Sequence, residues 1–151
     1  MTKPKAIIFD IDGTLAIRDK GPDGRGPYDW DRVGEDLPNE PVMLVASMLA
    51  IATDFYSAAR VEILFFSGRD ERCREQTEMW LDHHFGSGYK LYMRPAKHNG
   101  PDDELKRDFC EAVSQFYDIA AVFDDRNRVV DMWRSNGVTC MQVCSREDGD
   151  F

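Results

Sequence analysis

Two carboxylates separated by one residue directly follow an apolar run near the start of the chain. The stretch from Phe9 reads Phe-Asp10-Ile-Asp12-Gly13-Thr-Leu. Because Gly13 permits a turn, both carboxylates can face one crevice at the end of a strand. A calcium loop is disfavoured, since it needs acids at positions one, three and five and glycine at six, whereas Gly13 is at the fourth position.

A hydroxyl, a glycine and an arginine follow the apolar run at residues 61–66. They are Ser67, Gly68 and Arg69. At the end of a strand, these groups can supply hydrogen-bond donors to an oxyanion. The pattern is weak on its own, because Ser-Gly is also an ordinary turn between a strand and a helix.

Two further groups of charged residues occur later in the chain. Asp102 and Lys106 lie in the first turns of a predicted helix, where a surface ion pair between residues i and i+4 is the alternative interpretation. Asp124 and Asp125 follow an apolar run. Adjacent acids repel each other and therefore indicate a cation nearby, although Asp125 could also cap a helix.

These residues must be positioned by alternating strands and helices. Short apolar runs typical of buried parallel strands occupy residues 5–11, 61–66, 90–93, 119–123 and 138–143. Helical periodicity occupies residues 42–59 and 70–85, a segment that Pro101 opens, and a last segment that Gly137 ends. The pattern predicts an α/β fold: a doubly wound, Rossmann-like, five-stranded and mainly parallel sheet with helices on both faces.

One segment, at residues 16–40, interrupts this alternation. It is rich in glycine and proline and has little apolar periodicity. A loop of about 25 residues is unusual in a compact domain unless it is a lid, a binding loop or disordered. It leaves the carboxyl end of the first strand, where α/β sheets bind ligands. We therefore predict a short substrate-gating flap, with a floppy insertion as the alternative.

Composition limits the classes of function. The chain has 151 residues, about one domain, and 28 acidic against 19 basic residues, hence a net charge of −9. This charge argues against a protein that coats nucleic acid, but not against an enzyme that contacts a few phosphates. Apolar runs of at most five residues predict neither a membrane span nor a signal peptide. The four cysteines form no CxxC pair, which favours free thiols in a reducing cytoplasm.

The order Asp-x-Asp, Ser, Lys, Asp-Asp resembles the haloacid dehalogenase superfamily of phosphotransferases. A closer resemblance is to the 3′-phosphatase domains of the bacteriophage polynucleotide kinase/3′-phosphatase family, carried by residues 3–16, 24–29, 124–134 and 149–151. The G-x-x-x-x-G-K-[ST] loop of a kinase does not occur in the sequence. The resemblance thus implies a single phosphatase domain over residues 1–151, with no kinase domain.

The resemblance implies a covalent mechanism. Asp10 would be the nucleophile that forms an aspartyl-phosphate, and Asp12 the general acid and base. That role requires Asp12 to be protonated when substrate is bound, so we expect its neighbours to raise its proton affinity. Mg²⁺ would bind Asp10, the backbone carbonyl of Asp12, and one or both of Asp124 and Asp125.

Other residues would bind the phosphate. Ser67 and the amide of Gly68 would hold one phosphate oxygen, Lys106 would offset phosphoryl charge, and Asp102 would position Lys106 or an arginine. Three arginines could reach the transferring phosphate or the next one along the strand: Arg25 of the flap, Arg69 and Arg94.

The implied function is magnesium-dependent removal of 3′-terminal phosphates from DNA or RNA ends during repair. The expected partners are 3′-phosphorylated ends and a separate kinase or ligase, with no membrane, in the cytoplasm (of the host cell for a phage-encoded protein). A small-molecule phosphatase or nucleotidase of the same superfamily is the alternative. A signalling receiver domain is disfavoured, because there the acidic pair precedes the phosphate-accepting Asp. DNA or RNA specificity, activity on 2′,3′-cyclic phosphates or mononucleotides, the existence of a separate kinase partner and the oligomeric state stay open.

Overall fold

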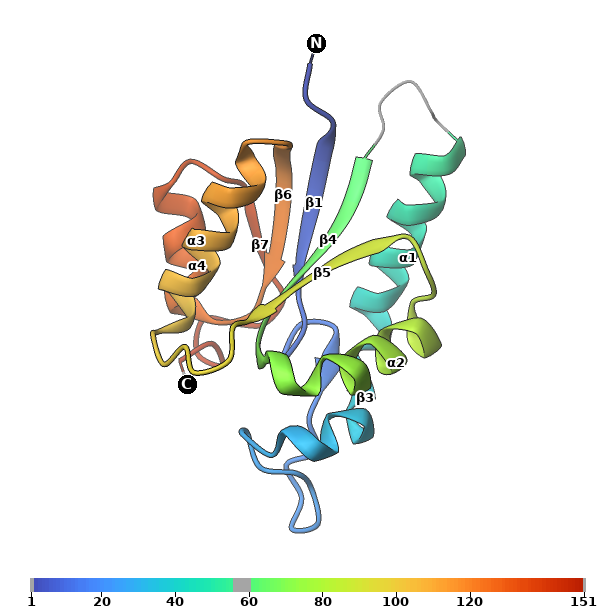
Figure 1. Cartoon of the computed structure of the whole chain (residues 1–151), viewed down its shortest axis with the longest axis vertical. Helices are drawn as coiled ribbons and strands as arrows, with labels where there is room; N and C mark the ends of the chain where they lie inside the picture. Colours follow the sequence, from blue (N-terminus) through green and yellow to red (C-terminus); the bar gives the residue numbers. More distant parts are fainter. Residues whose placement is uncertain (1, 56–60, 151) are drawn as a thin grey trace.

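The computed structural model describes residues 2–55 and 61–150, in which a central parallel sheet is enclosed by helices (Figure 1). The strands, in spatial order, are β5 (Tyr89–Arg94), β4 (Val61–Asp70), β1 (Lys5–Asp10), β6 (Asp118–Asp124) and β7 (Cys140–Gln142). The helices are α1 (Glu40–Phe55), α2 (Arg74–His84), α3 (Asp102–Ser114) and α4 (Asn127–Ser135). All neighbouring strands of this sheet are parallel. The predicted doubly wound α/β fold is confirmed, and the sheet is wholly rather than mainly parallel.

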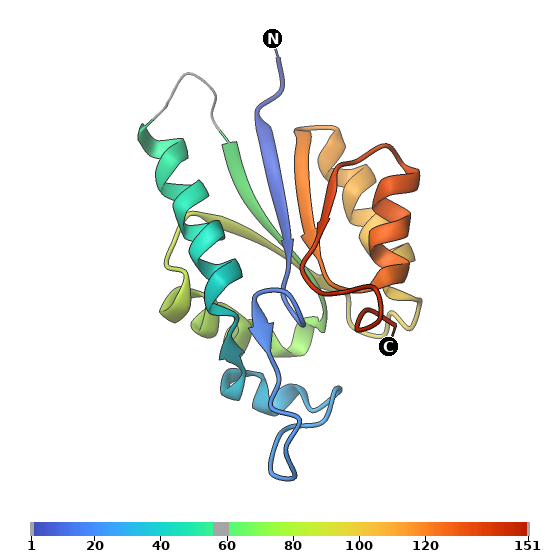
Figure 2. The same cartoon turned by 180° about the vertical axis from the view of Figure 1, so that it is seen from behind.

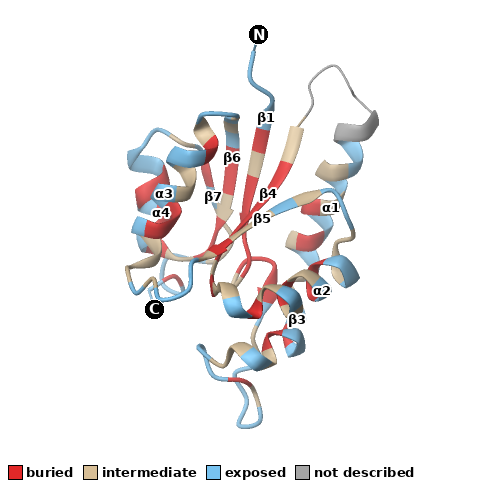
Figure 3. Ribbon diagram, viewed as in Figure 1, coloured by how far each residue is buried: buried red, intermediate tan, exposed pale blue. Residues whose placement is uncertain are grey.

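Alternation along β1 explains why helices cover both faces of the sheet. Ala6 and Ile8 pack in a core with residues of α3 and α4, whereas Phe9 packs in a second core with residues of α1 and α2. Successive side chains of a strand point to opposite faces of the sheet. Because consecutive residues of β1 are apolar, both faces of the sheet must be covered by helices. Figure 3 shows buried residues along the strands and on the inward sides of the helices.

The five strands run in one direction, so their carboxyl ends gather at the lower edge of the sheet in Figure 1. β1 lies in the centre, between β4 and β6. Each motif singled out in the sequence lies at the carboxyl end of one of these three strands or in the first turns of α3, the helix after β5. The topology therefore brings the motifs to one edge of the sheet.

The flap at residues 16–40 has regular structure, which the sequence analysis did not predict. Its two ends pair as antiparallel strands β2 (Ala16–Ile17) and β3 (Leu37–Pro38), and η1 (Trp30–Glu35) is a short 3₁₀ helix. Val33 of η1 is buried in a small core with Cys73 and Met93. In Figures 1 and 2 the flap extends below the carboxyl ends of the strands. It is a packed part of the fold rather than a floppy insertion.

Some predicted boundaries were wrong. β4 continues through Ser67, Gly68 and Arg69 to Asp70, with an irregularity in its pairing to β5, so these residues are not a turn after the strand. The helix predicted from residue 70 begins only at Arg74, after the 3₁₀ turn η2 (Glu71–Cys73). Residues 56–59 of the predicted helix at 42–59 lie outside the described residues. None of the described helices combines the length and apolar character needed to cross a membrane.

Candidate active site

The chain turns sharply directly after β1, and this turn separates the two carboxylates of the Asp-x-Asp pair. Ile11 accepts a backbone hydrogen bond from Ala16 at 2.8 Å, and Gly13 has a positive φ of 89°. A Cβ on Gly13 would lie 2.0 Å from Oδ2 of Asp125. Glycine is therefore required here both for the backbone conformation and for the close approach of Asp125.

Three buried carboxylates meet at the carboxyl ends of β1 and β6. Ligand oxygens of Asp10, Asp124 and Asp125 all lie within 4.8 Å of one another, and the Thr14 hydroxyl lies 3.3 Å from Oδ1 of Asp125. Among the described residues, Arg126 is the N-cap of α4, so Asp125 does not have the capping role considered above. A buried set of hard oxygen ligands fits a magnesium ion.

Lys106 of α3 reaches into this acidic group. Its Nζ lies 2.7 Å from Oδ1 of Asp10, 2.9 Å from Oδ2 of Asp124 and 3.2 Å from Oδ2 of Asp102. With an exposed fraction of 1%, Lys106 does not form the surface ion pair that was considered as an alternative.

The charges of this group depend on each other. Burial lowers the pKa of Lys106, but Asp10, Asp102 and Asp124 together raise it well above its usual value, so Lys106 stays charged. Burial raises the pKa of Asp10 well above its usual value; Lys106 opposes this rise, and Asp124 and Asp125 add to it. A bound cation would relieve the repulsion among these carboxylates.

Asp12 lies within the turn after β1 and contacts two arginines instead of the acidic group. Arg69 donates from Nε to Oδ2 and from Nη2 to Oδ1 of Asp12, both at 2.9 Å. Arg25 donates from Nη2 to Oδ1 at 3.1 Å. Burial raises the pKa of Asp12, but Arg69 and Arg25 outweigh it and lower the pKa from its usual value. The expectation that its neighbours raise its proton affinity was wrong, because the fold brings both guanidinium groups to this carboxylate.

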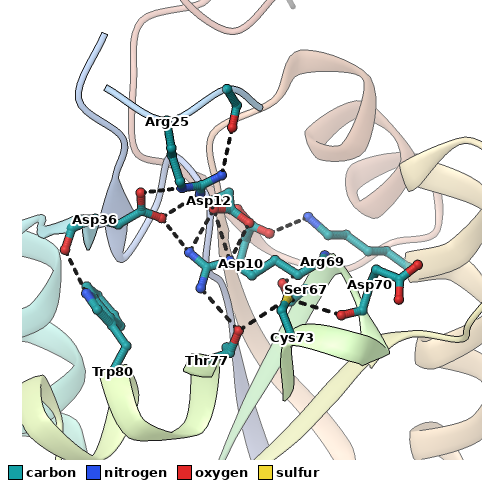
Figure 4. A network of polar contacts seen from close by, with 12 residues as sticks. Asp10, Asp12, Arg25, Asp36, Ser67, Arg69, Asp70, Cys73, Thr77 and Trp80 are labelled. Carbon is teal, nitrogen blue, oxygen red and sulfur yellow. Dashed lines mark hydrogen bonds and ion pairs between the residues drawn. The ribbon is translucent and has the colours of Figure 1, made fainter. Parts of the chain in front are cut away.

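The structure adds Asp36 of the flap, a residue that the sequence analysis missed. Its carboxylate accepts hydrogen bonds from Arg25 at 2.7 and 2.6 Å and from Arg69 at 2.7 Å, and its carbonyl accepts one from Trp80 (Figure 4). Nothing in the local sequence distinguishes Asp36 from other acids. Two arginines assigned to a buried site require acidic partners. That requirement was the signal by which the sequence could have indicated an acid such as Asp36.

Ser67 and Gly68 lie at the irregular end of β4, beside Asp10 and Arg69. Ser67 is buried, and its Oγ accepts the backbone N–H of Arg69 at 3.1 Å (Figure 4). A Cβ on Gly68 would lie 2.4 Å from Oδ1 of Asp102. The small residue thus lets the first turn of α3, with Asp102, approach the end of β4.

Arg94, predicted to contact a phosphate, is instead occupied with protein acceptors. It donates from Nε to the carbonyl of Gly68 at 2.9 Å, from Nη1 to the carbonyl of Gly100 at 2.6 Å, and from Nη2 to Oδ1 of Asp102 at 3.2 Å. In this arrangement Arg94 ties the ends of β4 and β5 to the start of α3. These contacts give Arg94 a positioning role, and its contact with a phosphate stays a prediction.

The end of β7 and the segment that follows it hold the backbone around Asp125. Gln142 donates to the Asp125 carbonyl from Nε2, and Cys144 from Sγ, each at 3.0 Å. The backbone N–H of Asn127 donates to the carbonyl of Gly149 at 2.9 Å. These contacts, which the sequence analysis also missed, hold the end of β6 in place.

Comparison with known proteins agrees with this arrangement. The family model of the polynucleotide kinase PNKP phosphatase domain matches residues 4–151. The chain belongs to this family. It is therefore a phosphatase domain of the haloacid dehalogenase type, a phosphoric monoester hydrolase.

Relatives of this PNKP-type phosphatase domain are larger proteins. A protein of Autographa californica nuclear polyhedrosis virus, assigned as a bifunctional polynucleotide kinase/RNA ligase, is 36% identical over 145 residues, which are 93% of this chain and 20% of that protein. In two structures of Pnkp1/Rnl/Hen1 complexes, one of them described as an RNA repair complex, the matched chains have TM-scores of 0.78 and 0.79 and identities of 33% and 34%. These matches cover 93% and 99% of this chain, but 42% and 48% of those chains. The domain thus spans less than half the length of these relatives.

A more distant likeness concerns the fold alone. The class C acid phosphatase of Bacillus anthracis, solved with tungstate, has a TM-score of 0.54 and 22% identity, over 83% of this chain and 53% of that one.

Proposed function

We propose that this PNKP-type phosphatase domain removes 3′-terminal phosphate from nucleic-acid ends in a magnesium-dependent reaction, and that it acts beside other repair activities. The observation that carries the proposal is the group of Asp10, Asp124 and Asp125 around the buried Nζ of Lys106. This group brings together a carboxylate nucleophile, the positive charge of Lys106 and the oxygen ligands for a cation.

The reaction takes place in two displacements at phosphorus. A carboxylate oxygen of Asp10 forms a bond to phosphorus while the bond to the 3′ oxygen breaks, and Asp12 gives that oxygen a proton, which leaves a 3′-hydroxyl. Asp12 then accepts a proton from the water that attacks the aspartyl-phosphate. The bond between Asp10 and phosphorus breaks as the water attacks, which releases inorganic phosphate and restores the Asp10 carboxylate and the protonated acid of Asp12.

Asp12 must be protonated for the first displacement, although Arg25 and Arg69 lower its pKa. A bound phosphate brings negative charge beside Asp12 and offers the two guanidinium groups another acceptor. Both effects favour the protonated acid. We therefore propose that substrate binding itself prepares Asp12 as the acid.

The remaining groups balance charge on the phosphoryl group. Ser67 and the amide of Gly68 are proposed to donate to one phosphate oxygen, and Lys106 to neutralise another. Asp102 contacts Lys106 at 3.2 Å and so fixes its ammonium group. Mg²⁺ on Asp10, the carbonyl of Asp12, and Asp124 or Asp125 would polarise the phosphoryl group when bound.

RNA is the substrate that the relatives favour. One relative is assigned as a kinase/RNA ligase, and two others are chains of Pnkp1/Rnl/Hen1 complexes, one described as an RNA repair complex. A ligase or kinase that acts on the repaired end is then the proposed partner. The flap supports a polynucleotide over a small molecule, because Arg25 enters the site from it.

The test is phosphate release from oligonucleotides that carry a 3′-phosphate, compared with the same sequences carrying a 5′-phosphate, in RNA and in DNA. We expect release from the 3′ end alone, its loss with EDTA, and its loss in Asp10→Asn. The matched control Asp131→Asn, an exposed carboxylate paired with Arg146, should keep full activity. Equal rates at both ends, or turnover by Asp10→Asn, would contradict the proposal. Hydrolysis of mononucleotides alone would favour the nucleotidase alternative.

A further inference from the structure

Tyr28 of the flap is a large aromatic side chain with an exposed fraction of 79%. Its ring makes an edge-to-face contact with Trp30, with centroids 6.0 Å apart and an interplanar angle of 76°. Pro27 precedes it and restricts the backbone. Trp30 thus supports the Tyr28 ring, while most of the ring surface faces solvent. The Tyr28 ring therefore does not serve to fill a hydrophobic core.

The chain tethers Tyr28 to the catalytic carboxylates. Arg25 is three residues earlier, and its guanidinium lies 3.1 Å from Asp12. Three residues of extended chain span at most about 11 Å, so the Tyr28 backbone lies within about that distance of the Arg25 backbone.

Packing of Trp30 locates the pair independently. Trp30 packs against the small core of Val33, Cys73 and Met93. Met93 directly precedes Arg94, whose guanidinium contacts the carbonyl of Gly68 at the phosphate-binding end of β4. The aromatic pair therefore lies over the carboxyl ends of β4 and β5, at the rim of the site.

We propose that Tyr28, supported by Trp30, is a stacking surface for a nucleobase at or next to the 3′ end, and so selects a polynucleotide over a bare phosphomonoester. This inference rests on the proposed function and adds the substrate's base as a recognised group. Stacking on an aromatic ring tolerates any base sequence, as an end-repair enzyme requires. It also suits a domain of net charge −9, because stacking gains affinity without an excess of cations.

The experiment compares Tyr28→Ala and Tyr28→Phe with the unchanged protein. The substrates are 3′-phosphorylated oligonucleotides, either intact or with an abasic residue at the terminal or the second position. For the intact substrate, kcat/KM of Tyr28→Ala should fall about 5- to 100-fold, whereas Tyr28→Phe should stay within about twofold. An abasic residue should produce a similar loss in the unchanged protein and little further loss in Tyr28→Ala. Phe116→Ala is the matched control, since Phe116 is a similarly exposed aromatic (66%) between α3 and β6, where β6 begins at the opposite end of the sheet.

Binding gives a second readout that does not depend on turnover. Fluorescence anisotropy of a labelled 3′-phosphorylated oligonucleotide is measured in the Asp10→Asn background, with and without Tyr28→Ala. We expect the variant with both substitutions to bind the oligonucleotide more weakly than Asp10→Asn, by a factor similar to the loss in kcat/KM. Equal loss on intact and abasic substrates, or no loss in either measurement, would overturn the stacking surface and leave Tyr28 as a protein-contact residue. The unchanged protein could also bind the oligonucleotide through Tyr28 without releasing phosphate. That result would overturn the proposed function and leave the stacking surface in place.

Discussion

Oδ2 of Asp36 lies 2.7 Å from Nη2 of Arg69, although 33 residues separate them in the chain. The same carboxylate holds Arg25, and both arginines hold Asp12. Asp36 therefore links the flap to Asp12 through its buried ion pairs with Arg25 and Arg69. It does not contact the acidic group itself, so its contribution is to position the arginines.

Asp36→Asn should weaken both the fold and the chemistry. Two buried guanidinium groups lose the charge of their common partner, which should cost about 3–5 kcal/mol in the free energy of unfolding measured with urea. kcat on a 3′-phosphorylated oligonucleotide should fall at least about tenfold, because Arg25 and Arg69 are no longer held against Asp12. The control Glu35→Gln removes an exposed partner of Arg32 and should change stability by less than about 1 kcal/mol. Equal effects of the two variants would contradict the positioning role.

Lys106→Met should destabilise the protein when no magnesium is present. The substitution leaves Asp10 and Asp124 buried without their cation, at a cost of about 3–5 kcal/mol in urea unfolding. Added Mg²⁺ should restore part of that stability while activity stays at least about 100-fold reduced. Lys90→Met, at a half-exposed lysine, should stay within about 0.5 kcal/mol of the parent. A fully stable Lys106→Met protein would show that these carboxylates need no cation.

Magnesium should raise the melting temperature of the unchanged protein. At a concentration tenfold above Kd, binding adds about 1.4 kcal/mol, which is a shift of about 3–6 °C for a domain of this size. Asp125→Asn should lose most of this shift, since it removes a charged ligand from the group of three. Asp131→Asn, at an exposed acid paired with Arg146 and outside the group of three, should keep it. A full shift in Asp125→Asn would leave Asp124 as the ligand from this pair, and a full shift in Asp124→Asn as well would place the ion elsewhere.

Gly13→Ala should disrupt the same group through the backbone. The new Cβ would lie 2.0 Å from Oδ2 of Asp125, at a φ of +89° that side chains rarely adopt. We expect a loss of at least about 2 kcal/mol in thermal unfolding, together with loss of the magnesium-induced shift. Gly34→Ala is the comparison, because nothing lies within 4 Å of its added Cβ. If Gly13→Ala binds magnesium normally, the turn after β1 is more tolerant than its geometry indicates.

Local patterns in the sequence were sufficient to predict the core of the fold. Apolar runs of strand length alternating with helical periodicity require a covered parallel sheet, since both faces of each strand are apolar. Parallel strands place their carboxyl ends at one edge, so the proximity of Asp10, Ser67 and Asp124 also followed from the sequence. The boundary at Asp70 was missed because a β-irregularity and a turn have similar local sequences.

Tertiary structure alone decided how the charges are paired. The sequence determined the sheet, its order of motifs and the acids and lysine at its edge. It did not determine that Asp36 joins Arg25 and Arg69, that these arginines lower the pKa of Asp12, or that Arg94 is occupied by carbonyl groups. Strand and helix patterns depend on neighbours a few residues apart. An ion pair depends on distance in space, and the packing of the flap against α2 and β5 sets that distance.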